Sequence, residues 1–148
     1  MIQTIEILPQ ALTSNTDDVN FTITDLRTNS ANCCGWLQYN NGSSDFTILG
    51  GGTFEIHFNG NVSSATVGPV AVALKSNGSD VEGTEMDQDV ATANTYYNIS
   101  FTKLIRICPR LNKTFSIGSL ASIGGITPPE ETEIPILKDM NFYVKKLN

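Results

Sequence analysis

Basic residues are scarce in this 148-residue sequence, which has nine Lys and Arg against fifteen Asp and Glu and a formal net charge of −6. A nucleic-acid-binding surface needs a dense set of cations to displace counterions from phosphates. Docking on anionic lipid needs cations as well. Apolar runs are short, and none approaches the roughly 20 residues that a membrane-spanning helix requires. We therefore expect neither nucleic acid nor a membrane as a partner.

A secretion signal is also lacking, because the first residues, MIQTIE, carry no basic segment and no apolar segment behind it. The cysteine count of three is odd, with Cys33 and Cys34 adjacent and Cys108 apart. A bridge between neighbours in sequence strains the peptide geometry, whereas either one could pair with Cys108 and leave one thiol free. The pattern favours three buried thiols in a chain folded in a reducing cytoplasm.

Catalytic residues are nearly absent, since the chain has a single histidine, His57. Any Ser–His–Asp or Cys–His arrangement would depend on it. It falls mid-strand beside Glu55, which favours a strand residue at the surface or at a seam between subunits. A zinc site would need a fourth ligand beside the cysteines, and no Cys-x-x-Cys spacing occurs. The sequence predicts no catalytic residue, no metal and no cofactor, and therefore no enzyme.

An acidic run is the other candidate for a ligand-binding site. Its carboxylates could supply oxygen ligands to calcium, but the EF-hand pattern is missing, so a solvated acidic turn is the favoured interpretation. The run comprises Asp80, Glu82, Glu85, Asp87 and Asp89.

The chain has the texture of an all-β protein. No segment of eleven or more residues keeps helical spacing of apolar positions, and Asn, Gly, Ser and Thr cluster between short apolar runs. Regularly spaced short strands predict a sandwich or barrel, and Asn77-Gly78 predicts a hairpin turn. The expected strands are 19–26, 36–39, 46–49, 53–58, 69–74, 81–86, 96–108, 113–118 and 140–147, with a bulge near Lys103.

Two segments interrupt the regular spacing of strands. Residues 1–18 contain a short alternating piece followed by Pro9 and a polar stretch, which predicts an N-terminal arm before one domain spanning 19–148. Residues 120–137 are rich in Gly, Pro and Glu, and their prolines are incompatible with a central strand. We therefore expect a long loop there.

The order of the segments resembles that of small jelly-roll domains related to tumour necrosis factor and the complement globular head. Relatives of this kind include small phage and prophage head-fibre or decoration proteins and bacterial spore-surface collagen-like proteins. The resemblance covers about residues 9–148. It rests on the strings GGTFEIHFNGNVSS (51–64), GPVAVALKSNGSDVEGTEM (68–86), YYNISFTKLIRICP (96–109), KTFSIG (113–118) and MNFYVKKL (140–147).

The resemblance implies an antiparallel jelly-roll sandwich of nine to ten strands that assembles as a homotrimer and acts by binding. Aromatic and aliphatic residues line the trimer axis of that family. By their positions in the pattern, the residues expected near the seam are Phe58, Tyr97, Phe101 and Tyr143.

With no Gly-X-Y stalk in the sequence and no signal peptide, the resemblance predicts a phage virion structural protein. It would be a head fibre or capsid decoration protein, made in the host cytoplasm and exposed on the virion surface as trimers that aid attachment to the host. The arm would dock on the capsid or another virion protein. The expected contacts are Ile2, Ile5, Ile7 and Leu8, and the expected exposed tips are the 120–137 loop and the turns Asn41-Gly42 and Asn77-Gly78.

Two alternatives remain open. One is a receptor- or carbohydrate-binding tip of a tail fibre, in which Trp36, Tyr39 and Tyr143 would stack on a host surface glycan. For Trp36 a buried position is the favoured interpretation. The other alternative is a bacterial surface adhesin module.

Overall fold

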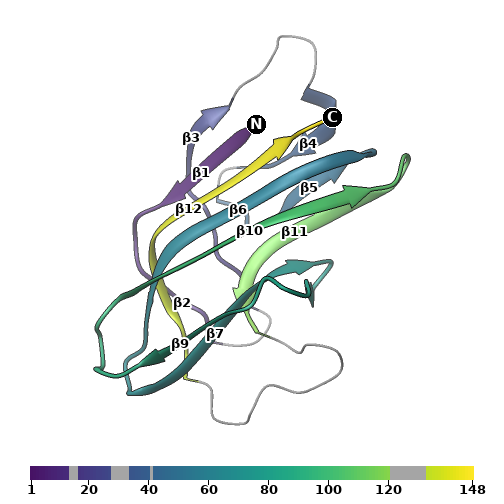
Figure 1. Ribbon diagram of the computed structural model, residues 1–148. Coiled ribbons are helices and arrows are strands. Elements are labelled where there is room, and N and C mark those ends of the chain that lie inside the picture. The colour runs from purple at the N-terminus through teal and green to yellow at the C-terminus, as the bar shows by residue number, and fades with distance from the viewer. Residues whose placement is uncertain (14–16, 28–33, 41, 121–132) are drawn as a thin grey trace.

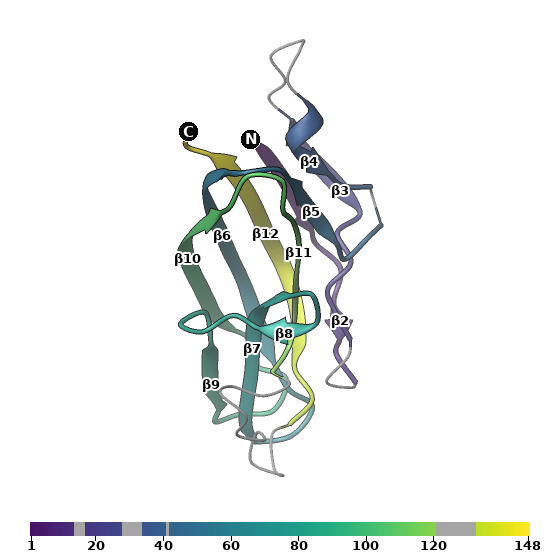
Figure 2. The same ribbon diagram turned by 90° about the vertical axis from the view of Figure 1, so that its right-hand side faces the viewer.

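Two antiparallel sheets pack face to face in the computed structural model of the chain (Figures 1 and 2). The structure describes residues 1–13, 17–27, 34–40, 42–120 and 133–148. Sheet A has the order β10-β6-β12-β1-β3, with β2 paired to β12, and sheet B has the order β4-β5-β11-β7-β8, with β9 paired to β7. The predicted all-β, antiparallel sandwich is confirmed. Within the described ranges, no helix is long and apolar enough to cross a membrane.

The chain passes several times between the two sheets. Sheet A contains β1 (Ile2–Glu6), β2 (Gln10–Ala11), β3 (Ile23–Arg27), β6 (Gly52–Ser63), β10 (Tyr97–Ile107) and β12 (Ile136–Lys146). Sheet B contains β4 (Leu37–Gln38), β5 (Phe46–Leu49), β7 (Gly68–Ser76), β8 (Ser79–Asp80), β9 (Met86–Val90) and β11 (Asn112–Ser119), and a short 3₁₀ turn, η1 (Cys34–Trp36), precedes β4.

Alternation of apolar and polar residues puts the core between the sheets. In β6 the side chains of Phe54, Ile56 and Phe58 are fully buried, while those between them point outward. The Phe142 ring of sheet A meets the Phe46 ring of sheet B with centroids 4.4 Å apart. Each such ring contributes roughly 1.5–3 kcal/mol when fully buried, so this contact is a main tie between the two layers.

Residues 1–18 do not form a separate arm. Strand β1 lies inside sheet A, where it pairs with β12 on one side and β3 on the other. The Glu6 carboxylate is buried and accepts hydrogen bonds from the backbone N–H groups of Leu8 and Thr22 and from the Thr22 hydroxyl. The predicted boundary at residue 18 is therefore wrong, because the short alternating piece at the N-terminus is a sheet strand.

Several predicted strand limits change as well. The weak strand expected at 81–86 is absent. Strand β9 begins instead at Met86, the last residue of that expected strand. The bulge expected near Lys103 is absent too, because β10 keeps one register with β6 from Tyr97 to Ile107. The irregularity lies instead in β12, between Lys138 and Asn141. The turn prediction holds: Asn77 and Gly78 both have positive φ, 52° and 81°, as a tight hairpin requires.

The loop and cysteine predictions are partly outside the described residues, which omit 121–132 and Cys33 and give no side-chain position for Cys34. Strand β12 begins at Ile136, so the expected loop ends before residue 137. Cys108 is free and exposed, at the end of β10. The expectation of three buried thiols is therefore wrong for Cys108, because β10 ends there and a turn follows.

A partly buried ion pair fastens the 17–21 segment to sheet B. The Asp18 carboxylate lies 3.6 Å from the Lys75 ammonium and accepts a 2.7 Å hydrogen bond from the Ser116 hydroxyl. Asp18 also bridges to Gly118 in β11. A Cβ at Gly118 would lie 2.1 Å from Asp18 Oδ1 and 2.8 Å from the backbone oxygen of Asp17. The close approach thus requires glycine at position 118.

We predict that Gly118→Ala lowers the free energy of unfolding by about 1–3 kcal/mol, the range for overpacking a buried site. The matched control is Gly35→Ala, where an added Cβ meets nothing within 4 Å. Urea denaturation of both variants gives the comparison. Equal stability of the two variants would contradict the close packing of the N-terminal segment on β11.

Candidate functional site

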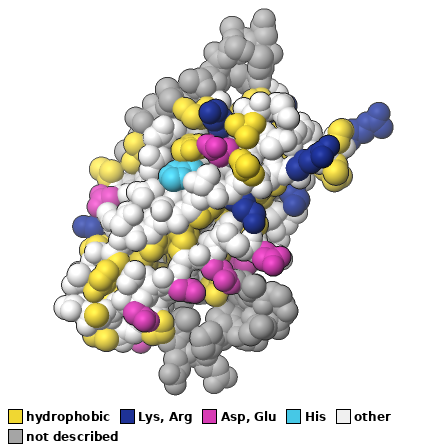
Figure 3. Space-filling model, viewed as in Figure 1, with side chains coloured by type: hydrophobic (Ala, Val, Ile, Leu, Met, Phe, Trp, Pro, Cys, Tyr) yellow, Lys and Arg dark blue, Asp and Glu magenta, His cyan; other side chains and the backbone are white. Residues whose placement is uncertain are grey.

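The outward face of sheet A is the candidate site. Outward residues of β1, β12, β6 and β10 stand opposite one another across the sheet, so that Gln3, Tyr143, His57 and Thr102 form one continuous line, which we call the central row. The space-filling view places the single histidine in the middle of this face (Figure 3). Sequence-distant residues are thus brought together by strand register alone.

Direct contacts fix the side chains of the central row. The His57 and Tyr143 rings stack, with centroids 4.9 Å apart and planes 23° from parallel. His57 Nδ1 lies 2.8 Å from the Thr102 hydroxyl oxygen. The Tyr143 hydroxyl donates a 2.7 Å hydrogen bond to Glu55 Oε1. The result is a flat, partly buried platform of two rings, in which His57 Nδ1 and the Tyr143 hydroxyl are already bonded within the subunit.

The Tyr143–Glu55 bond also affects the acidity of the phenol. Its hydrogen bond to the carboxylate raises the pKa of Tyr143 above the ordinary 10.0, and burial and the negative charge of Glu55 raise it further. The phenol therefore stays protonated, as a donor, at every physiological pH.

Asparagine side chains flank the central row on one side. Asn98 Nδ2 donates to the backbone oxygen of Gly60 at 3.1 Å and to Asn61 Oδ1 at 3.3 Å, and it lies beside Asn59, which donates to Asn98 Oδ1 at 3.2 Å. Across β6, Asn141 Oδ1 is buried and finds no hydrogen-bond partner within the described residues. This part of the face is polar but uncharged, and it keeps one acceptor unsatisfied.

The arrangement is poorly suited to catalysis. A hydroxyl beside an imidazole, as in Thr102 and His57, is half of a nucleophile–base pair. The His57 ring has Tyr143 stacked on it, and no carboxylate bonded to either of its nitrogens in the described structure orients it as a base. The described residues also contain no group of three or more His, Cys, Asp or Glu side chains placed to hold a metal ion. The face is better suited to contact with another surface.

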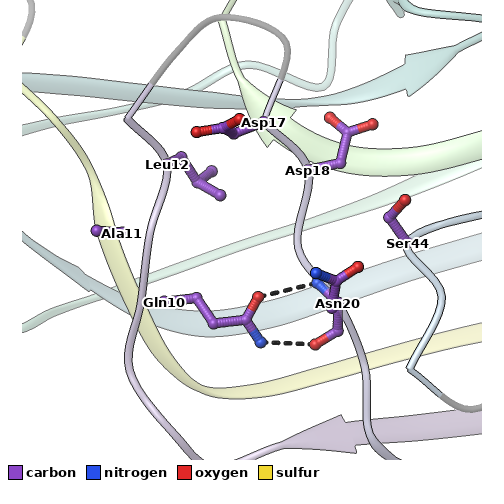
Figure 4. A pocket seen from close by; sticks show the side chains of 7 residues that line it. All are labelled: Gln10, Ala11, Leu12, Asp17, Asp18, Asn20 and Ser44. Carbon is purple, nitrogen blue, oxygen red and sulfur yellow. Dashed lines mark hydrogen bonds between the residues drawn. The ribbon is translucent and has the colours of Figure 1, made fainter.

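A concave site lies away from this face, between the N-terminal segment and the turn before β5 (Figure 4). Gln10 and Asn20 close one side by exchanging two hydrogen bonds, of 2.6 Å and 2.9 Å. Asp18 also lines it, but its carboxylate is committed to Lys75 and Ser116. The polar groups of this open depression of about 490 Å³ serve mainly to hold the chain together.

The residues predicted for a trimer seam fall into three environments. Tyr143 lies on the outward face of sheet A. Tyr97 and Phe101 are half-buried on β10, the edge strand of that sheet. Phe58 is fully buried, with the Phe101 ring 6.2 Å from its own. It therefore belongs to the core of one subunit, because strand alternation turns it away from the surface.

The residues predicted for attachment and for sugar stacking are also dispersed. Ile2 is buried in the core and Ile5 is half-buried on the outward face, so only Ile7 and Leu8, 55% and 64% exposed, remain free for docking. Tyr39 is buried and stacked on Phe46, with its hydroxyl bonded to the backbone oxygen of Phe21. Trp36 is partly buried against Phe54. Of the three aromatics predicted to bind sugar, the prediction for Tyr39 is wrong, because Tyr39 is a core residue.

Three solved structures share this architecture. No family model matches the chain, and no curated protein matches its sequence. The globular domain of zebrafish complement 1qA matches with a TM-score of 0.57 and 13% identity, over 96% of this chain and 94% of that one. Eiger, a tumour necrosis factor from S. frugiperda, gives 0.62 and 9%, over 99% and 91%. Murine APRIL gives 0.51 and 10%, over 93% and 96%.

The fold is therefore a jelly-roll sandwich of the complement and tumour necrosis factor type. The resemblance drawn from the sequence predicts this fold, and the structural matches confirm it over almost the whole chain. At such low identities the matches establish the architecture and do not carry over the activities of those proteins.

Reasoning from sequence found two members of the central row and missed two. It named Tyr143 as a seam residue and placed His57 at a surface or seam. It missed Gln3 because residues 1–18 were interpreted as an arm, and Thr102 because a threonine in a strand carries no distinctive signal. Pairing the alternation of 53–58 with that of 96–108 and 140–147 would have found Thr102.

We predict that Glu55→Gln lowers the pKa of Tyr143 toward 10, because the anionic acceptor of the phenol is lost. The raised pKa stabilises the fold with its full contribution below about pH 10, and this contribution is lost as pH rises through the folded-state pKa. Ultraviolet absorbance titration of the four tyrosines, with Tyr143→Phe as the reference, measures the shift. Identical titration curves for the wild type and Glu55→Gln would contradict the assignment.

Proposed function

We propose that the chain is a non-catalytic structural module that assembles as a homotrimer through the outward face of sheet A. The observation that carries this proposal is the central row, in which stacked His57 and Tyr143 rings form a platform in the middle of the face. Aromatic side chains are enriched and charged side chains depleted at the centres of protein interfaces. Beside this platform the Glu55 carboxylate is already bonded to Tyr143.

The open edge of sheet A at β10 adjoins this contact surface, and its core-facing side carries Tyr97 and Phe101. Tyr97 and Phe101 are half-buried there, and completing their burial needs a second surface against the edge. A cyclic arrangement supplies it, since the edge of one copy meets the face of the next and three such contacts close a ring.

For the biological setting we propose a phage virion surface, where the trimer is a head fibre or capsid decoration protein that aids attachment to the host. Support comes from the family resemblance of the sequence and from the absence of a catalytic arrangement on the described surface. Exposed Ile7 and Leu8, which follow β1, supply an apolar contact for a capsid or other virion protein. The dispersal of Trp36 and Tyr39 gives no support to a sugar-binding tip.

We predict a solution mass near three times 16.0 kDa by multi-angle light scattering at moderate salt. Thr102→Arg, which puts a charge beside His57 in the central row, shifts the mass toward one subunit. The control Ser79→Arg adds the same charge to β8 of sheet B and leaves the mass unchanged. A wild-type mass near 16.0 kDa, or equal behaviour of the two variants, would exclude trimer formation through sheet A.

The virion assignment predicts that the protein copurifies with particles of a phage that encodes it. An antibody against the chain labels intact particles in electron micrographs, and Ile7→Asp/Leu8→Asp reduces the labelling at least about tenfold if each exposed side chain contributes typical contact energy. Val67→Asp, at another exposed apolar position, serves as the control. Particles that remain unlabelled by an antibody that binds the free protein would exclude a virion location.

A further inference from the structure

One end of the sandwich carries most of the positive charge. Of the nine Lys and Arg residues, five surround the Gly50–Gly52 turn between β5 and β6. Lys145 and Lys146 pair across β6 with Glu55 and Phe54, and Arg106 pairs with Thr53 on the other side. We call this surface the basic end, and its cations are Arg106, Arg110, Lys113, Lys145 and Lys146.

The remaining two cations of the basic end adjoin the same turn. Lys113 of β11 pairs with Ile48 of β5, just before the turn. Arg110 follows Pro109, whose backbone lies so close to Gly51 that a Cβ there would come within 2.7 Å of the Pro109 nitrogen. The five cations therefore form one surface in a protein whose net charge is −6.

Among the residues that the structure describes, none of the cations of the basic end forms a salt bridge. The two salt bridges of the described residues lie elsewhere, between Lys75 and Asp18 and between Lys138 and Asp139. Leu104, Leu111 and Leu147, which lie among these cations, are 61%, 55% and 44% exposed. The basic end is thus a charged surface with apolar contacts available between the charges.

The opposite charge gathers on β9 and the turn before it. Glu82, Glu85, Asp87 and Asp89 are all exposed there, and we call them the acidic strip. Figure 3 shows a row of acidic side chains across the lower part of the molecule and most of the Lys and Arg side chains above it. Burial raises the pKa of Glu85, and the nearby carboxylates of Asp87 and Asp80 raise it further. The carboxylates of the strip therefore repel one another.

One nearby cation offsets only part of this repulsion. Lys103 reaches the strip, where its ammonium donates to the backbone oxygen of Glu82 at 2.8 Å, so one positive charge faces four carboxylates. The β9 part of the strip, Asp87 and Asp89, lies far from the basic end along the sheets. β9 pairs with the beginning of β7, from Gly68 to Val72, whereas the basic end adjoins the beginning of β6, one strand length away.

We propose that the basic end of one copy docks on the acidic strip of another copy. The two surfaces carry five positive and four negative exposed or half-exposed charges, so they are complementary between copies. Such a contact joins different patches on the two partners and is heterologous. Neutralising the strip removes the repulsion among its carboxylates, which is the gain that favours the contact.

This contact goes beyond the proposed trimer. In a cyclic trimer all three copies point the same way along the axis, so their basic ends gather at one level and their acidic strips at another. A contact between those levels joins one trimer to the next. Three parallel contacts per pair of trimers give avidity to ion pairs that are individually weak and are screened by salt.

Light scattering across a salt series tests the proposal, with reductant present so that the exposed Cys108 cannot form disulfides. We expect the average mass at about 0.02 M salt to exceed that at about 0.5 M salt at least about twofold, since screening shortens the Debye length severalfold over this range. The high-salt mass reports the trimer by itself. A salt-independent mass near three subunits would overturn this inference and leave the trimer standing, whereas a high-salt mass near one subunit would overturn the trimer alone.

Charge-reversal variants locate the contact. Arg110→Glu/Lys113→Glu and Asp87→Lys/Asp89→Lys each lose the low-salt association, and mixing the two variants restores it, because one retains an intact acidic strip and the other an intact basic end. Both changes lie away from the central row. The controls Lys138→Glu and Asp45→Lys reverse charges elsewhere and retain the association. Loss in the controls as well, or failure of the mixture to associate, would overturn the proposal.

Discussion

The pairing of β12 with both β6 and β1 is the constraint on which the rest of this structure depends. It places the last strand of the chain in the middle of sheet A and the first strand beside it, so both termini are fixed at the same end of the sandwich (Figure 1). The inward side of β12 supplies Phe142 and Val144 to the core. Its outward side supplies Tyr143 to the central row and Lys145 to the basic end. One strand thus links the stability of the fold to both proposed contact surfaces.

Local pattern was enough to predict the sandwich, because strand alternation and turn chemistry depend on near neighbours. The strand at 46–49 and the Asn77-Gly78 turn have the limits and geometry that their sequences predict. The error at residues 1–18 has a physical cause. A short alternating segment becomes a central strand only if a distant partner pairs with it, and here that partner is β12. Single-sequence reasoning has no access to such long-range pairing, although the alternation in Ile2–Glu6 was visible.

The candidate site was harder to predict for the same reason. Tyr143, His57 and Thr102 are far apart in sequence and meet only through the register of three strands. Phe58 carries the same hydrophobic signal as a seam residue, yet a shift of one position in an alternating strand decides between the core and the surface. Aromatic content predicts that a residue is structurally important. It does not predict which face of the sheet the residue occupies.

Net charge alone does not describe how the charges are distributed over the surface. A value of −6 implies a protein that avoids anionic partners, but the fold sorts the charges into a basic end and an acidic strip. Composition cannot reveal this separation of charges, because the separation depends on which strand ends lie together in the fold. The same jelly roll thereby carries the central row on the face of sheet A and opposite charges on the basic end and the acidic strip.

The central claim is that the outward face of sheet A lies between copies of the chain. Hydroxyl-radical footprinting read by mass spectrometry tests it most directly, because Tyr143 is half-buried in one subunit and reactive when uncovered. The account predicts that oxidation of Tyr143 in the wild type is several-fold lower than in a Thr102→Arg subunit, as expected when a ring becomes part of a packed interface. Equal oxidation of Tyr143 in both proteins would contradict it.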